Sequence, residues 1–306
     1  MSDDGATWRI VGVYADGLSA IGAISNRSGI VVFGNDWRFG GNVIWHSADA
    51  AHWDLVAVGE PVLEGDSVAD GLALTSGGFV LYGVPPVCSE DGCFQVEAAR
   101  VLVSDDGISW EMTPTPVSFT AVTEIEGGDL IAFGGSMSEP TTWISTDGGR
   151  DWRLYGPDRS TRRTNSVEVW VVEATPFGLV AAGLDSDQQP TFWLSEDNKT
   201  FEPTLDISLE ADGYNTTHID AITYGNGWVI AVGAVDIDTP SPQPVIWASQ
   251  DAKTWQTVNL EGTFFRGAWL TGAIQRDSVF VAVGTHGLSP GNAGRPLALR
   301  WDSAPG

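Results

Sequence analysis

The sequence predicts an all-β fold: a single six-bladed β-propeller over residues 1–306, with four antiparallel strands in each blade. Three observations predict it. A Ser-x-Asp motif recurs six times, an apolar run that ends in glycine also recurs six times, and the aspartates of successive motifs lie 41 to 57 residues apart. A constant core with unequal spacing indicates repeated structural units joined by loops of variable length.

The Ser-x-Asp motif consists of a serine, one variable residue and an aspartate, followed by a small turn and an aromatic residue, as in 104–110 and 249–255. Short polar side chains can hydrogen-bond to nearby turn amides, and the aromatic residue can pack beneath the blade. We therefore expect the aspartates of the motif to have a structural role. They are Asp4, Asp49, Asp106, Asp147, Asp197 and Asp251.

The apolar runs that end in glycine are 30–34, 79–83, 130–134, 179–183, 229–233 and 280–284. Unbroken apolar runs bounded by glycine are typical of strands buried on both faces. An apolar anchor stands two residues before each motif serine from Ser47 onward, and two residues before Ser303 after the last run. The anchors are Trp45, Leu102, Trp143, Trp193, Trp247 and Trp301. Each unit thus contains an A strand, a B strand ending in glycine, a variable loop, a C strand, the Ser-x-Asp turn and a D strand.

The two ends of the chain together supply one blade. The segment 299–303 is predicted to be a C strand that stops where its turn should begin, whereas the N-terminus begins with a Ser-x-Asp motif and a D strand at 8–11. Pairing of this N-terminal outer strand with the C-terminal strand would close the ring and remove the free sheet edges.

This pattern resembles the Asp-box (bacterial neuraminidase repeat) propellers of the sialidase superfamily, over nearly the whole chain. The resemblance implies that the box is a structural turn between the two outer strands. Sialidases also carry an arginine triad, an early Phe-Arg-Ile-Pro-like motif and a Tyr–Glu nucleophile pair. The segment 19–25 contains no such arginine, and neither Tyr214 nor Tyr224 has an evident glutamate partner. The resemblance therefore implies an Asp-box propeller without sialidase activity.

The charge balance restricts the partners. Asp and Glu total 40 against 15 Lys and Arg, which gives a net charge of −25. Nucleic acid and anionic membrane surfaces are disfavoured because they carry the same sign of charge. The acidic surface serves solubility or attracts cations and basic partners. No apolar run is long enough to span a membrane.

The first residues do not form a signal peptide and run straight into the repeat, as in a chain whose export signal has been removed. Cys88 and Cys93 lie close together across a glycine-containing turn, which favours a small disulfide over two free thiols and indicates an oxidising compartment. We expect an exported monomer in the extracellular space, in the periplasm or on the cell surface.

No metal or cofactor is expected. Two cysteines are too few for a structural zinc site. Two Asp-x-Asp pairs could contribute to a calcium site, but neither matches an EF-hand loop, so ordinary polar loops are the simpler interpretation. The pairs are Asp185/Asp187 and Asp236/Asp238.

Any ligand site is expected on the rim opposite the Ser-x-Asp turns, where the B–C loops and the D-to-A crossovers lie. The A strands are expected to line the channel. The polar and aromatic residues at or near the starts of these strands are Ser19, Asp70, Thr120, Glu168, Trp170, His218, Asp220, Arg266 and Trp269. The candidates for ligand binding are Trp37, Arg38, Arg159, Arg162, Arg163, His218, Arg266 and Trp269.

Two groups among these residues carry specific chemistry. The arginines at 159–163 could bind carboxylate, sulfate or phosphate groups, or could pair with neighbouring acids. His218 and Asp220, two residues apart on a strand, should share a face. They could transfer a proton or hold a metal, although a hydrogen-bonded pair in the channel lining is the simpler interpretation.

We therefore expect a non-catalytic, exported propeller that binds a glycan or a protein through the rim carrying the B–C loops. The alternative is a glycoside hydrolase, which needs two carboxyl groups across the glycosidic bond. Its weak candidates are Asp70, Glu168 and Asp220. A third possibility is a structural module of a larger surface protein. Fold analogy alone does not choose among these, since propellers have many functions.

Overall fold

The computed structural model describes fifteen stretches of the chain, all of them β-strands or the turns and short segments beside them. They are residues 18–26, 28–36, 42–49, 52–56, 71–84, 99–136, 139–155, 168–185, 190–204, 217–237, 239, 241–258, 267–276, 279–286 and 295–301. The chain divides into two compact units, Met1–Arg159 and Ser160–Gly306.

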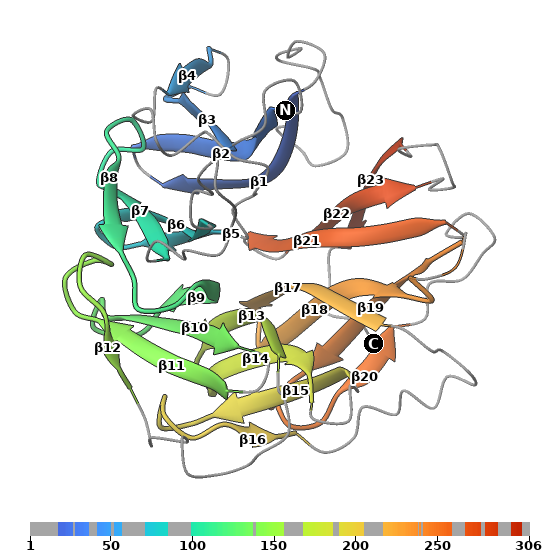
Figure 1. The fold of residues 1–306 in the computed structure, drawn as a ribbon. Coiled ribbons are helices and arrows are strands. Elements are labelled where there is room, and N and C mark those ends of the chain that lie inside the picture. The colour runs from blue at the N-terminus through green and yellow to red at the C-terminus, as the bar shows by residue number, and fades with distance from the viewer. Residues whose placement is uncertain are drawn as a thin grey trace. The chain divides into compact units, whose positions relative to one another are not determined.

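The first unit contains three four-stranded sheets, blades 1 to 3 (Figure 1). Blade 1 consists of β1 (Leu18–Asn26), β2 (Gly29–Asp36), β3 (Asn42–Ser47) and β4 (Asp54–Val56). Blade 2 consists of β5 (Gly71–Thr75), β6 (Gly78–Val84), β7 (Arg100–Ser104) and β8 (Glu111–Pro114). Blade 3 consists of β9 (Phe119–Glu124), β10 (Leu130–Ser136), β11 (Glu139–Ser145) and β12 (Arg153–Leu154).

The second unit contains blades 4 to 6. Blade 4 consists of β13 (Glu168–Thr175), β14 (Gly178–Leu184), β15 (Pro190–Ser195) and β16 (Glu202–Pro203). Blade 5 consists of β17 (Thr217–Gly225), β18 (Trp228–Val235), β19 (Gln243–Ser249) and β20 (Gln256–Val258). Blade 6 consists of β21 (Ala268–Arg276), β22 (Val279–His286) and β23 (Arg295–Trp301).

Every pair of neighbouring strands in these sheets is antiparallel, and the strands follow one another in chain order. The predicted fold class is confirmed: the fold is all-β, with six blades of antiparallel strands arranged as a β-propeller. The fourth strand predicted for blade 6 is residues 8–11, which lie outside the described residues. Ring closure and a single domain over 1–306 therefore stay predictions.

The core lies between the faces of consecutive blades. Between blades 4 and 5 it contains Val180 and Phe192 from one sheet and Ile219 and Trp247 from the other. The apolar run of the second strand is largely buried in blades 1 to 5, where the strand has a sheet neighbour on both sides and packs against a neighbouring blade; Val229 to Val232 are all fully buried. In blade 6 the burial is less complete, because Val283 of β22 is 41% exposed. This burial explains the unbroken apolar runs in the sequence.

The five described Ser-x-Asp turns share one hydrogen-bond pattern. The serine Oγ donates to the aspartate Oδ1 over 2.8 to 3.4 Å, and one or two backbone amides of the turn donate to that Oδ1 over 2.7 to 3.0 Å. In four of them the residue after the aspartate has a positive φ, which favours Gly or Asn. These four residues are Gly107, Gly148, Asn198 and Ala252.

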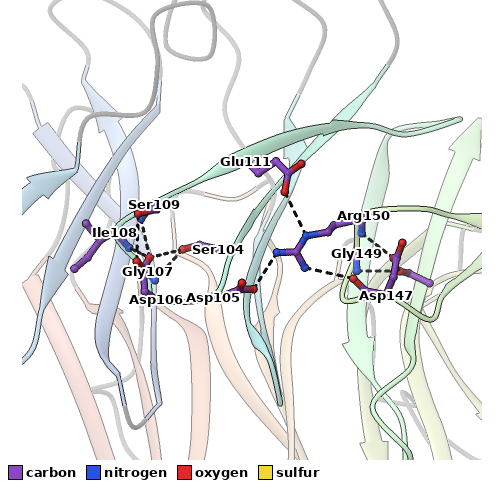
Figure 2. A network of polar contacts seen from close by, with 11 residues as sticks. Ser104, Asp105, Asp106, Gly107, Ile108, Ser109, Glu111, Asp147, Gly149 and Arg150 are labelled. Atoms are coloured by element: carbon purple, nitrogen blue, oxygen red, sulfur yellow. Dashed lines mark hydrogen bonds and ion pairs between the residues drawn. The ribbon is translucent and has the colours of Figure 1, made fainter.

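Arg150 links two consecutive turns, as Figure 2 shows. Its guanidinium lies 3.0 Å from Asp105 and 3.3 Å from Glu111, both in blade 2. The turns of blades 4 and 5 are linked in the same way, because Lys253 Nζ lies 2.6 Å from Glu196 Oε1. All of these side chains are exposed or nearly so, and such pairs contribute little to stability in water.

The aromatic residue at the end of the motif packs between blades. Trp152 is 6% exposed, donates from Nε1 to the Gly149 carbonyl and lies against Phe119, with 4.6 Å between ring centroids. Trp255 stacks on Phe192 of the preceding blade at 3.9 Å. The turn thus holds the outer strands and also places a large apolar side chain in the core.

Candidate functional site

The first strand of each blade, here called the inner strand, carries a β-bulge at the same place in at least five blades. The register against the second strand skips one residue on the inner strand in each case. A bulge leaves its extra residue unpaired and redirects the side chain. The extra residues are Ile21, Thr120, Trp170, Asp220 and Thr271.

In the five blades with this bulge, the glycine that ends the apolar run lies opposite it. Gly183, Gly233 and Gly284 pair with the residue just before the extra one. A Cβ on Gly233 would collide with the backbone carbonyl of His218, and the other two glycines meet the same obstacle. The glycine is therefore required by the close approach of two backbones. The backbone bulge thus recurs from blade to blade, whereas the side chain of the extra residue differs.

Three consecutive inner strands bring four side chains together, here called the bulge cluster: Trp170 of β13, His218 and Asp220 of β17, and Trp269 of β21. The imidazole of His218 stacks on the indole of Trp170, with 4.1 Å between centroids and 15° between planes. Trp269 Nε1 donates to Asp220 Oδ2 over 2.7 Å. The rings of His218 and Trp269 are 6.0 Å apart.

A regular relation generates these contacts. In each case the bulge residue of one blade meets the residue two positions before the bulge in the next blade. Trp170 meets His218 in this way, and Asp220 meets Trp269. Because the inner strands β13, β17 and β21 lie side by side, the cluster runs across all three blades of the second unit.

The pair formed by His218 and Asp220 differs from the expected hydrogen-bonded pair. His218 Nδ1 lies 3.3 Å from Asp220 Oδ2, close enough for an ion pair if the ring is protonated, but it has no hydrogen-bond partner among the described residues. Trp269 Nε1, at a shorter distance, donates to the same oxygen. The hydrogen-bond partner of the Asp220 carboxylate is therefore the indole of Trp269 in the next blade.

The cluster is partly open to solvent. The side chains of His218 and Asp220 are 33% and 18% exposed, and both tryptophans are half-buried. Asp220 Oδ1 has no hydrogen-bond partner among the described residues, and no lysine or arginine of that part of the chain pairs with this carboxylate. Chemically, the cluster offers aromatic surface beside a carboxylate oxygen that can accept further hydrogen bonds.

The cluster lies at the predicted end of the blades. His218 pairs with Ala234 and Trp269 with Thr285, so both are level with the end of the second strand, where the loop to the third strand begins. The Ser-x-Asp turns lie at the other end, since Ser249 pairs with Val229 at the start of the second strand.

Glu173 on β13 is a second unusual group of the inner strands. It pairs with Val180, which in turn pairs with Leu194, so the three share the face of blade 4 that packs against blade 5. Glu173 as a whole keeps intermediate solvent exposure, and the burial of its carboxyl in this apolar interface raises its pKa to about 7. This carboxyl is thus poised to be protonated near neutral pH.

The turn carboxylates shift in the opposite direction. Hydrogen bonds from the backbone amides of Thr200 and Lys199 lower the pKa of Asp197 to about 2. The amides of Ser109 and Ile108 likewise lower the pKa of Asp106. A charged carboxylate is what such amides stabilise, which accounts for both shifts.

A groove of 680 Å³ lies beside the turns of blades 4 and 5. Its charged lining includes Glu196, Asp197 and Lys253, which already pair with one another or with turn amides. None of the described residues that line the groove is aromatic. We therefore locate the candidate site at the bulge cluster.

The structure brings three predicted site residues together, namely His218, Asp220 and Trp269. Glu168 is half-buried at the start of β13, two positions before Trp170. Other predicted residues lie outside the described residues: Asp4, Trp37, Arg38, Asp70, Cys88, Cys93, Arg159, Arg162, Arg163, Asp187, Asp238 and Arg266.

Trp170 is among the predicted strand starts but not among the predicted ligand-binding residues. A sequence signal does identify it. Trp170, Asp220 and Thr271 each stand thirteen residues before the glycine that ends the apolar run of their blade, Gly183, Gly233 and Gly284. The same count reaches Asp70 from Gly83.

No protein-family model matches the chain, and no curated protein matches it in sequence. Solved structures with the same fold do. One is YCF48 bound to D1 peptide, with a TM-score of 0.56, 12% identity, and coverage of 91% of this chain and 78% of that one. Another is the SapL1 lectin in complex with alpha methyl fucoside, with a TM-score of 0.55, 14% identity, and coverage of 95% and 94%.

A third is the Hadza microbial sialidase Hz136, with a TM-score of 0.54, 13% identity, and coverage of 87% of this chain and 62% of that one. At these identities the likeness shows the fold alone. Propellers of this kind thus include a lectin, a peptide-bound protein and a sialidase.

Within the described part of the chain, no helix is long and apolar enough to cross a membrane. The same residues contain no group of three or more His, Cys, Asp or Glu side chains that could hold a metal ion.

Proposed function

We propose that this chain is an exported, non-catalytic propeller of the Asp-box type that binds a glycan through the bulge cluster of blades 4 to 6. The observation that carries the proposal is the arrangement of Trp170, His218 and Trp269 around the Asp220 carboxylate. Aromatic faces pack against the apolar faces of sugar rings, while a carboxylate accepts hydrogen bonds from their hydroxyl groups.

Three further facts support a binding role at this place. The cluster lies on rigid strands at the blade end that carries the variable loops. The fold does not demand its side chains, because the same bulge holds isoleucine or threonine elsewhere. Among structures of similar fold is the SapL1 lectin in complex with alpha methyl fucoside.

The test is a glycan array followed by titration calorimetry on the wild type, Trp170→Ala and Trp269→Ala. We expect micromolar to millimolar binding, weakened at least about tenfold by either substitution, since stacking aromatics carry much of such binding energy. The matched control is Ile274→Ala, because Ile274 lies on the strand of Trp269, is 60% exposed and is outside the cluster. Circular dichroism melting checks that each variant folds.

Two results would contradict the proposal. Binding that survives in both tryptophan variants would place the site elsewhere, for example at Trp37 or the arginines at 159–163. No glycan binding at all would leave a protein partner, as YCF48 has in its D1 peptide, and would remove the glycan-binding function.

A glycoside hydrolase is the second candidate, and Glu173 is the observation that favours it. A carboxyl with a pKa near 7 suits a general acid, and Asp220 could supply the second carboxyl. However, Glu173 shares its face with Val180 and Leu194 in the packed interface between blades 4 and 5. Hydrolysis of an aryl glycoside that both Glu173→Gln and Asp220→Asn abolish would establish the enzyme instead.

A further inference from the structure

The bulge cluster carries a charge that bears on which glycans could bind there. Its central polar group is the Asp220 carboxylate, which can only accept hydrogen bonds while ionised. Trp269 Nε1 occupies one oxygen at 2.7 Å, and the other oxygen has no partner among the described residues. A ligand must therefore bring donors to this oxygen, and hydroxyl or ammonium groups are donors whereas a carboxylate is not.

Another carboxylate lies at the start of the neighbouring inner strand, and the chain as a whole is acidic. Glu168 lies two positions before Trp170 on the same strand, and the chain has a net charge of −25. The two lysines in the described part of the second unit, Lys199 and Lys253, belong to Ser-x-Asp turns at the opposite end of the blades, and Lys253 is paired with Glu196. No arginine or lysine of the described residues pairs with Asp220. Among the described side chains, a second carboxylate placed here would meet the charge of Asp220 with no lysine or arginine paired to it.

We propose that the bulge cluster binds uncharged or amine-bearing saccharides and rejects saccharides that carry a carboxylate, with Asp220 as the specificity-determining residue. The inference rests on the proposed glycan-binding function and gives its ligand class. Rejection arises from like-charge repulsion and from the desolvation of two anions that cannot pair. The arginines at 159–163 represent the opposite prediction, an anion-binding rim.

The experiment uses matched pairs of immobilised oligosaccharides that differ only at C6, where one carries a hydroxymethyl group and the other a carboxylate. Suitable pairs are galactose and galacturonate oligomers, and glucose and glucuronate oligomers, with glucosamine oligomers as the amine-bearing probe. The wild type is expected to bind the neutral member at least about tenfold more tightly. Raising the salt concentration from low to high should narrow that ratio, because salt screens the repulsion.

Asp220→Asn keeps the size of the side chain and removes its charge. We expect this variant to narrow the neutral-to-acidic ratio to within about threefold, chiefly by tightening the binding of the acidic member. Glu202→Gln removes the same net charge from an exposed residue of β16 and should leave the ratio unchanged. Thermal melting of both variants checks that they fold.

The outcomes separate the two proposals. Equal or tighter binding of the acidic member by the wild type overturns the inference and leaves the glycan-binding function standing. A preference for the neutral member that Asp220→Asn does not alter also overturns it, because the discrimination then arises elsewhere. Failure to bind any member of any pair overturns the proposed function itself.

Discussion

The Ser-x-Asp turns and the inner-strand bulges both repeat from blade to blade, but they use their side chains in opposite ways. In the turns the aspartate recurs because backbone amides need its oxygen, as for Asp106 and Asp197. At the bulges the backbone recurs while the side chain changes from isoleucine to threonine, tryptophan or aspartate. An aspartate that the frame does not demand is the stronger functional candidate, and Asp220 is one.

The two regions also differ in electrostatics. Backbone amides lower the pKa of Asp197 to about 2, whereas burial raises the pKa of Glu173 to about 7. The turn carboxylates thus stabilise the fold when they are charged, and Glu173 favours the fold when it is neutral. The stability contributions of the turn carboxylates and of Glu173, a single carboxyl on the inner strand β13, therefore have opposite dependences on pH.

The largest expected effect comes from the glycine opposite a bulge. Gly233→Ala should lower the free energy of unfolding by about 3 kcal/mol, because the new Cβ would collide with the backbone of His218 and Ile219. The control is Gly77→Ala, where the nearest atom lies 3.9 Å away and little change is expected. Urea denaturation of both variants measures the difference. A small effect at Gly233 would show that the bulge is not rigid.

A smaller, pH-dependent effect is expected at Glu173. Its folded pKa is raised, so the stability it contributes is fully present below the unfolded pKa, near 4.5, and is lost as pH rises through about 7. The free energy of unfolding of Glu173→Gln, relative to that of the wild type, should therefore rise by about 2 kcal/mol between pH 4.5 and pH 8. Urea denaturation at both pH values checks it, with the exposed Glu202→Gln as control. Parallel behaviour of the wild type and Glu173→Gln would contradict burial of this carboxyl.

The smallest expected effect is the loss of one turn carboxylate. Asp106→Ala should lower the free energy of unfolding by about 1 kcal/mol, because two backbone amides and two hydroxyl groups lose their hydrogen-bond acceptor. The cost should shrink as pH falls below about 4, since the lowered pKa of Asp106 means that its contribution is lost on acidification. Arg150→Ala, at a neighbouring turn, should change stability by less than about 0.5 kcal/mol. Thermal melting between pH 3 and pH 7 compares Asp106→Ala with Arg150→Ala. An equal loss of stability in both variants would show that the turn hydrogen bonds contribute no more than the surface ion pairs.

By itself the sequence determined the repeat: six blades, the order of their strands and the positions of the Ser-x-Asp turns. It could do so because these features depend on local chemistry, such as a turn aspartate and its amides or a strand buried on both faces. It also placed Glu168, Trp170, His218, Asp220 and Trp269 at the strand starts, since strand boundaries follow from the same repeat.

Only the tertiary structure decided which of these side chains meet. Trp170 and His218 are 48 residues apart in sequence, and Asp220 and Trp269 are 49 apart. Their contacts depend on a bulge that redirects one side chain towards the next blade, and on the close approach of two backbones opposite a glycine. The sequence shows that glycine only as the end of an apolar run. Its physical reason, a carbonyl that leaves no room for a Cβ, exists only once the strands are paired.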